Sequence, residues 1–307
     1  MPPRSPLPQR HGLDAAWVRT PDNLPDTNTR WATLREFLVD RLAAMAPIAE
    51  MLAAGEFVDQ AGRTLTGEEP YRPNTFVWFH RALPPEPVVP FPVAVMYADE
   101  RIAVVDKPHF LATTPRGTHV RESVLARLRS QLDVPDLAPA HRLDRLTAGV
   151  LVLTTDRRHR AAYADLFQSG RAHKTYEALA PVDPTLEFPR RLSSRIEKRR
   201  GNLQAEVVAG EPNAETLVEL IETRGSCGRY RLTPFTGKTH QLRVQMAGLG
   251  LPIVGDPLYP RVLNVAGDDF STPLQLVARR LRFTDPLDQT PRVYTSRFAL
   301  DWPEQEQ

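Results

Sequence analysis

The 307-residue sequence contains a single cysteine, Cys227, so it can form neither an internal disulfide nor a cysteine-based zinc site. It has no apolar run near the roughly 18 residues that a membrane-spanning helix needs, and the start, Met1 to Pro8, lacks the apolar core of a signal peptide. No cluster with metal-ligand spacing and no dinucleotide-binding fingerprint is present. We therefore expect a cytoplasmic protein that needs no metal, no cofactor and no membrane.

Neither sign of charge is in large excess, because 39 lysines and arginines nearly balance 37 aspartates and glutamates and leave a net charge of +2. Any affinity for a polyanion must therefore come from local clusters of basic residues. The apolar share of 41% is sufficient for a large core. A length of 307 residues fits one large domain or two smaller ones.

Proline is abundant, with 30 residues, and several prolines gather between Leu83 and Pro92. Such a stretch is stiff and extended, which is typical of a linker. We therefore expect an irregular N-terminal arm over 1–30, a small domain over 31–82, the linker over 83–92 and a second domain over 93–307.

The second domain is organised around the stretch from Ala140 to Thr154. Its polar residues lead directly into Val150 to Leu153, a β-prone apolar run that predicts a buried strand. Asp144 precedes this strand and lies between Arg142 and Arg145, whose positive charges favour an ionised carboxylate. The residues alone leave two interpretations open: a functional carboxylate, or a surface cluster of ion pairs beside a strand.

Three stretches together resemble the RluA family of RNA pseudouridine synthases. The first is the catalytic-type motif His141-Arg142-Leu143-Asp144, followed by Thr147 and Gly149. The second is Lys174 to Leu179, and the third comprises Thr236 to Val244 with Pro252 to Tyr259. The resemblance extends over about Val93 to Phe283. It implies an α+β catalytic domain with a large mixed, mainly antiparallel sheet flanked by helices.

The resemblance also implies roles for individual residues. Asp144 would be the catalytic carboxylate, Arg243 its salt-bridge partner, and Tyr176 the aromatic ring beneath the target base. Arg142 would enter the RNA helix where the flipped uridine has left. The remaining candidates for substrate binding are His141, Lys174, His240 and Gln241. Gln245 departs from the family pattern, since a histidine is frequent at this position.

The implied reaction converts uridine to pseudouridine and needs no cofactor. The carboxylate could either form a covalent bond to the sugar or base, or remove a sugar proton. The expected partner is ribosomal or transfer RNA, bound by a monomer without an obligatory protein partner. Pro189 to Arg200 holds six basic residues and one acid, Glu197; this run could be a solvated loop, but in an RNA enzyme we favour phosphate contact.

The N-terminal part resembles, in outline, the S4 module, a small α/β RNA-binding fold. Leu34, Phe37, Leu38, Leu42 and Met45 have helical spacing, Pro47 to Gly55 predicts a second helix, and a glycine turn at Gln60 to Gly62 predicts a hairpin with Phe76 to Phe79. From Trp31 to Pro92, however, there are five arginines, no lysine and eight acidic residues. Phosphate binding requires clustered cations, so this part is either a weak RNA-binding domain or a structural appendage.

Parts of the sequence also suggest three other functions. Gly237-Lys238-Thr239 is not a phosphate-binding P-loop, because Leu232 occupies the position of the required first glycine. A glycosidase-like hydrolase would need a second carboxylate; Asp256 is the one acid near the motifs, and we expect it to shape a Gly-Asp-Pro turn. An RNA-binding or RNA-folding factor on an inactive synthase scaffold remains an alternative.

Overall fold

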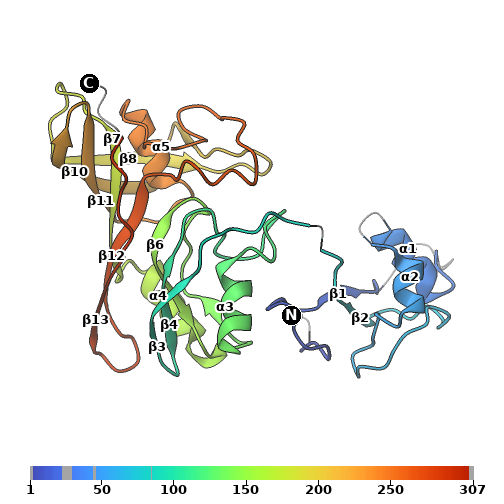
Figure 1. The fold of residues 1–307 in the computed structure, drawn as a ribbon. Helices are drawn as coiled ribbons and strands as arrows, with labels where there is room; N and C mark the ends of the chain where they lie inside the picture. Colours follow the sequence, from blue (N-terminus) through green and yellow to red (C-terminus); the bar gives the residue numbers. More distant parts are fainter. Residues whose placement is uncertain (1–2, 23–29, 44–45, 84, 304–307) are drawn as a thin grey trace. The chain divides into compact units, whose positions relative to one another are not determined.

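The computed structural model describes residues 3–22, 30–43, 46–83 and 85–303. The chain forms two compact units, Met1–Pro85 and Glu86–Gln307 (Figure 1), and each is described by itself. The predicted helix position Met45 and linker position Pro84 lie outside the described residues, as do 1–2 and 23–29 of the arm and 304–307 at the end.

The first unit contains two short helices, α1 (Leu34–Leu42) and α2 (Ile48–Ala53), at the predicted places. The Thr33 hydroxyl accepts a hydrogen bond from the backbone N–H of Glu36 and so caps α1. The apolar faces of both helices bury against the strand β2 (Phe76–Phe79).

Two details of the first unit differ from expectation. The arm predicted to be irregular contains a strand, β1 (Ala16–Arg19), which pairs antiparallel with β2 and places Trp17 opposite Trp78. In place of the predicted hairpin, Val58 forms only isolated bridges to Thr64 and Trp78. Two pairs of alternating residues in β1 are too short a pattern to recognise in the sequence. The S4-like assignment stays a prediction.

In the second unit, eleven strands of the described chain form one sheet, in the order β3-β4-β6-β12-β7-β11-β10-β8-β9, with β5 added beside β6 and β13 beside β12. The β6–β12 pair is parallel and every other pairing is antiparallel. This confirms the predicted α+β domain with a mixed, mainly antiparallel sheet. The strands are β3 (Ala94–Ala98), β4 (Ile102–Lys107), β5 (Ala138–Pro139), β6 (Ala148–Thr154), β7 (His173–Pro181), β8 (Arg190–Glu197), β9 (Glu206–Val208), β10 (Ala214–Arg224), β11 (Cys227–Pro234), β12 (Leu276–Thr284) and β13 (Pro291–Thr295).

Helices cover both faces of the sheet around β6. Val150 and Val152 of β6 pack with Tyr163 and Leu166 of α4 (Arg160–Gln168), which follows a 3₁₀ turn at Arg157–His159. On the opposite face, Leu151 and Leu153 share a core with α3 (Val124–Leu132) and α5 (Gln241–Gly248). Burial on both faces explains why β6 is a continuous apolar run rather than an alternating one.

Gly149 allows β6 and β12 to approach each other at their parallel contact. Its φ is +116°, and a Cβ atom added there would lie 2.4 Å from the backbone oxygen of Ala278. A larger residue would therefore push β12 away from the strand that follows Asp144.

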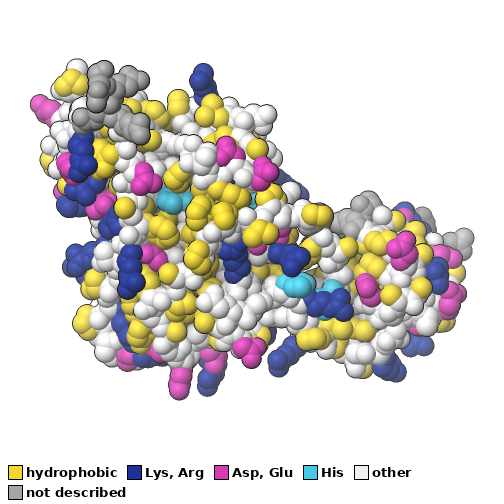
Figure 2. Space-filling view, viewed as in Figure 1, with side chains coloured by type: hydrophobic (Ala, Val, Ile, Leu, Met, Phe, Trp, Pro, Cys, Tyr) yellow, Lys and Arg dark blue, Asp and Glu magenta, His cyan; other side chains and the backbone are white. Residues whose placement is uncertain are grey.

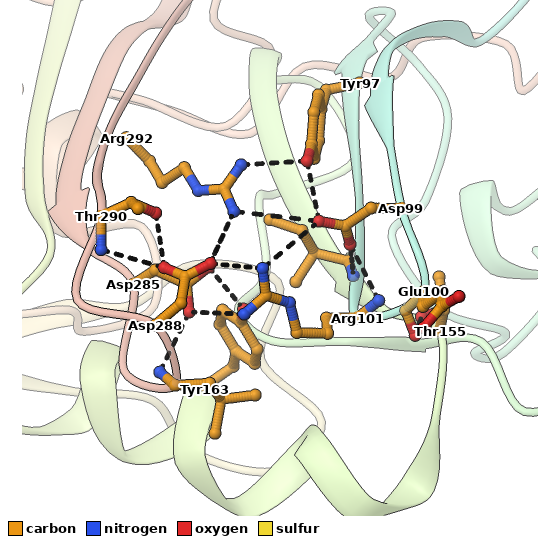
Figure 3. A network of polar contacts seen from close by, with 12 residues as sticks. Tyr97, Asp99, Glu100, Arg101, Thr155, Tyr163, Asp285, Asp288, Thr290 and Arg292 are labelled. Carbon is orange, nitrogen blue, oxygen red and sulfur yellow. Dashed lines mark hydrogen bonds and ion pairs between the residues drawn. The ribbon is translucent and has the colours of Figure 1, made fainter.

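A charged network joins the β3–β4 turn to α4 and the β12–β13 turn (Figure 3). At its centre, the fully buried carboxylate of Asp285 accepts a hydrogen bond from the Tyr163 hydroxyl at 2.8 Å and lies 3.4 Å from Arg292 and 3.9 Å from Arg101. Asp288 and Asp99 pair with the same two arginines from more exposed positions. The network fixes the end of the sheet where β3, β4, β12 and β13 meet.

Across the described ranges, every helix is too short or too polar to cross a bilayer.

Candidate active site

The backbone around Asp144 is fixed from both sides. The Thr113 hydroxyl donates to the carbonyl of Leu143 at 2.7 Å and accepts from its N–H at 3.2 Å. The N–H of Thr147 donates to the carbonyl of Asp144 at 3.1 Å and closes a turn. Asp144 therefore stands at a fixed position just before β6, and its side chain keeps 30% of its surface exposed.

The Arg243 guanidinium binds two carboxylates unequally. Its Nε and Nη2 donate to Asp256 at 2.8 and 2.6 Å, whereas Nη1 lies 3.6 Å from Oδ2 of Asp144. The expected Arg243–Asp144 ion pair is thus present, but 3.6 Å is too long for a good hydrogen bond. The two strongest contacts of the arginine go to Asp256 instead, because α5 carries Arg243 across the turn that contains Asp256.

Asp256 is completely buried and also shapes the turn in which it lies. Its Oδ1 accepts from the N–H groups of Leu258 at 2.8 Å and Tyr259 at 3.2 Å. The preceding Gly255 has a φ of +73°, and a Cβ there would lie 2.4 Å from the carbonyl oxygen of Pro273. The turn-forming role expected for Asp256 is therefore present together with a second role, the positioning of Arg243.

His240 and Tyr259 complete the surroundings of Asp144. The Nε2 of His240 lies 4.0 Å from Oδ2 of Asp144, and its Nδ1 lies 3.1 Å from the Tyr259 hydroxyl. The Arg243 guanidinium lies over the Tyr259 ring at 5.3 Å. Burial lowers the pKa of His240, and the attraction of Asp144 opposes this shift only in part, so the imidazole is neutral at pH 7.

Lys107, at the end of β4, is fully buried near Asp144. Its ammonium donates three hydrogen bonds, to the carbonyls of Pro108 at 2.9 Å, Leu111 at 2.8 Å and Arg145 at 3.1 Å. Burial lowers the pKa of Lys107 to about 7, although the charge of Asp144 opposes this effect. The lysine ties the loop that follows β4 to the segment that carries Asp144.

Tyr176 lies on β7 and packs against the core that contains α3 and α5. Burial raises the pKa of Tyr176, and the negative charge of Asp144 raises it further. The phenol therefore remains protonated at neutral and mildly alkaline pH. The structure brings Tyr176 near Asp144 from a strand more than thirty residues further along the chain.

His141 contacts protein rather than open solvent. Its ring stacks on Phe167 at 4.2 Å between ring centroids, and its Nε2 accepts from the N–H of Val152 at 3.2 Å. Burial lowers the pKa of His141 to about 3, and the neighbouring charge of Lys174 contributes to this shift. Burial also lowers the pKa of Lys174 itself. His141 is thus a neutral acceptor that holds the start of the motif against β6.

Gln241 is saturated with protein hydrogen bonds. Its amide nitrogen donates to the carbonyl of Glu215 and the hydroxyl of Thr216, and its oxygen accepts from the Thr236 hydroxyl and the Lys238 N–H. All four positions of the amide are filled, which leaves none for a ligand. The amide instead fixes the start of α5.

Gln245, one turn further along α5, extends the same network. It accepts a hydrogen bond from Thr216 at 2.7 Å and donates to Ser194 of β8 at 2.9 Å. Where a histidine is frequent in the resembled family, this glutamine therefore bridges α5 to two strands. Together the two glutamines hold α5, and hence Arg243, on the sheet.

The basic run Pro189 to Arg200 is a strand for most of its length rather than a loop. β8 ends at Glu197, and Lys198, Arg199 and Arg200 continue beyond it as exposed residues. Arg142, beside Asp144, is likewise exposed.

Comparisons with known proteins agree with this geometry. A family model described as RNA pseudouridylate synthase matches residues 101–248. The chain is 31% identical over 211 residues to the dual-specificity RNA pseudouridine synthase RluA of Vibrio parahaemolyticus, a match that spans 62% of this chain and 78% of that protein. RluA of Yersinia pestis is also 31% identical over 211 residues, spanning 64% of this chain and 95% of that protein. The chain belongs to the RluA family of RNA pseudouridine synthases.

Solved structures support the same fold. The human RNA pseudouridylate synthase domain containing 4 superposes with a TM-score of 0.52 and 26% identity, over 67% of this chain and 88% of that chain. As a member of the RluA family, the protein is an RNA pseudouridine synthase, an isomerase that acts on uridine in RNA. The matched residues, 101–248, include Asp144, Tyr176 and Arg243.

Sequence reasoning did not find three residues around Asp144. The sequence pattern assigns no role to Lys107, only a turn-forming role to Asp256, and only a place in the third matching stretch to Tyr259. Asp256 and Tyr259 lie within the third matching stretch, so their type and position were visible. Their contacts to Arg243 were not, because they depend on how α5 lies against the turn.

Proposed function

We propose that this enzyme isomerises specific uridines in structured ribosomal or transfer RNA, with Asp144 as the catalytic carboxylate. The observation that carries the proposal is the environment of Asp144: a half-exposed carboxylate on a fixed turn, 3.6 Å from a buried guanidinium. The proposal includes RNA as the sole obligatory partner of a monomeric, cytoplasmic enzyme, as the sequence predicts.

The division of Arg243 between two carboxylates supports this role. Asp256 takes the two short hydrogen bonds, so the guanidinium is held rigidly and does not cap the Asp144 oxygens with a short bond. Asp144 keeps a neighbouring positive charge when bound RNA excludes water from the site. Its oxygens nevertheless stay available to attack the sugar or base, or to remove a sugar proton.

Tyr176 and Arg142 would place the base. The protonated phenol of Tyr176 is near Asp144, so its ring can lie beneath the uracil while its hydroxyl faces the carbon that loses a proton. The exposed Arg142 precedes Asp144 by two residues and can fill the space that a flipped uridine leaves in a helix. Extrusion of a base from a stack costs a few kcal/mol, which such a replacement offsets.

The other four candidate residues divide into two that position the protein and two that could contact RNA. We assign His141 and Gln241 to positioning, because their polar atoms are bonded to β6 and to the start of α5. His240 and Lys174 remain candidates for RNA contact, since both are half-buried near the site.

The geometry disfavours the hydrolase alternative. Asp256 is the second carboxylate at the site, but its side chain is fully buried and its oxygens accept from Arg243 and two backbone N–H groups. A carboxylate in these contacts cannot activate a water molecule as a second acid or base would.

The test is an assay on transfer and ribosomal RNA transcripts that carry tritium at C5 of uridine. Isomerisation releases one tritium to water for each pseudouridine that is formed. Release of free uracil would instead indicate the hydrolase, and binding of RNA without either product would indicate an RNA-binding factor. Mapping of pseudouridine in RNA from cells with and without the gene then identifies the substrate.

A further inference from the structure

Side chains of β8, in the β8–β9 hairpin, alternate between two faces, so its basic residues do not all point the same way. Leu192, Ser194 and Ile196 face α5 and the core, since Ser194 bonds to Gln245 and Ile196 packs with Val244 and Tyr259. Successive residues of a strand point to opposite faces. Arg191 and Arg195 therefore face away from α5, whereas the even positions face the side on which His240 and Asp144 lie.

The two arginines on the opposite face are already paired. Arg191 binds Glu215 at 2.5 Å and lies over the ring of Phe235 at 4.8 Å, and Arg195 binds Glu197 at 3.1 Å. Each cation therefore has an acidic neighbour, so this face presents little uncompensated charge to a polyanion.

The end of the hairpin differs. Lys198, Arg199 and Arg200 are exposed, and so is Arg261 of the segment after Tyr259. In the described part of the chain none of these four forms an ion pair; the Lys198 ammonium donates to the backbone carbonyls of Arg199 and Asn202. We call these four residues the basic rim.

The basic rim is fastened to the candidate active site. The Tyr259 hydroxyl accepts from the N–H of Ala205 at 2.6 Å and donates to its carbonyl at 2.9 Å, and the same hydroxyl contacts His240. The Gln204 amide also donates to the carbonyls of Leu258 and Pro260. Burial is the main cause that lowers the pKa of His240, and the positive charge of Lys198 contributes, which places this lysine within electrostatic reach of the site.

We propose that the basic rim, and not the arginines within β8, binds the phosphates of the RNA strand that delivers the uridine to Asp144. Uncompensated cations beside the site match the charge of a phosphodiester backbone. On the face shown in Figure 2, basic and acidic side chains are interspersed, so a local group of cations that form no ion pair has an effect that the net charge of +2 does not supply. The proposal rests on the proposed function and names where its RNA lies.

The test compares two triple variants of the full chain. The rim variant is Lys198→Gln, Arg199→Gln and Arg200→Gln; the control, Arg191→Gln, Arg195→Gln and Arg224→Gln, removes the same charge from arginines that are each paired with an acid. Fluorescence anisotropy measures binding of a labelled RNA hairpin with a uridine-rich loop between 50 and 200 mM KCl. Any RNA serves as a probe because phosphate contacts are independent of sequence.

For the rim variant we expect the slope of log K against log salt to become shallower by about 2, since each phosphate contact to a single strand contributes about 0.7. Its affinity near 100 mM salt should fall by about tenfold, while the control keeps the slope and affinity of the parent. Equal losses in both variants, or no loss in the rim variant, would overturn the proposal. Binding is read without catalysis, so an inactive parent protein contradicts the proposed function and leaves this comparison intact.

Discussion

Arg243 binds Asp256 through two short hydrogen bonds and approaches Asp144 only at 3.6 Å. The arginine is therefore anchored by one carboxylate and presented to another. This division holds the buried guanidinium beside Asp144 without a short hydrogen bond to the Asp144 oxygens.

Replacement of the anchor, Asp256→Asn, should destabilise the fold and impair catalysis together. Removal of one partner of a buried ion pair typically costs about 3–5 kcal/mol, and Arg243 would become free to close on Asp144. Urea unfolding measures the free energy of unfolding, and tritium release measures kcat. Unchanged kcat in a folded Asp256→Asn protein would show that Asp256 does not control the position of Arg243.

Lys107 should make stability depend on pH. Burial lowers its pKa to about 7 in the folded protein, whereas an unfolded lysine has a pKa near 10.4. Between these values the unfolded chain binds more protons, so the free energy of unfolding rises with pH by a few kcal/mol. Below pH 7 both states are protonated and this contribution no longer changes.

The measurement is urea unfolding of the parent and of Lys107→Met from pH 6 to 9.5. We expect Lys107→Met to lack the rise above pH 7, and to lose stability because three buried carbonyls lose their donor. A difference between the two proteins that stays constant over this range would contradict the assignment.

Tyr176→Phe removes the hydroxyl and keeps the ring. If the hydroxyl assists proton transfer, kcat should fall by about 100-fold or more, while RNA affinity is retained because the ring can still stack. Burial and Asp144 raise the pKa of this phenol, so the parent should show no loss of activity from its ionisation up to pH 9. Parent-like kcat in Tyr176→Phe would limit Tyr176 to stacking.

The network in Figure 3 should stabilise the sheet without affecting catalysis. Asp285→Asn leaves Arg292 and Arg101 without their buried partner and should cost about 3–5 kcal/mol. Asp288→Asn, at a site that is 30% exposed, is the matched control and should cost much less, because water screens the charge of an exposed partner. Thermal unfolding measures the loss of stability in each variant. Equal losses would show that the exposed contacts of the network stabilise the fold as much as the buried carboxylate of Asp285 does.

Much of the fold could be predicted because it depends on local pattern. The continuous apolar run of β6 indicated a buried strand, and the spacing of Leu34, Phe37, Leu38 and Leu42 indicated α1. The charges of Arg142 and Arg145 on either side of Asp144 are also visible locally, and they indicated a carboxylate among cations.

The remaining features depend on distant contacts. Asp256 meets Arg243 because Gly255 makes a turn that only glycine allows so close to Pro273. Lys107 meets the carbonyl of Arg145 across 38 residues, and β1 exists because β2 offers it a partner. No periodicity in the sequence encodes these encounters, since each is decided by the packing of separate elements.

The most direct test of the account is the Asp144→Asn variant, which keeps the size of the side chain and removes its charge. We expect this variant to bind the RNA hairpin with parental affinity and to unfold at a temperature close to that of the parent. On a uridine-tritiated RNA that the parent modifies, it should release no tritium above background. Release at a rate near that of the parent, from a variant confirmed by mass, would contradict the central role of this carboxylate.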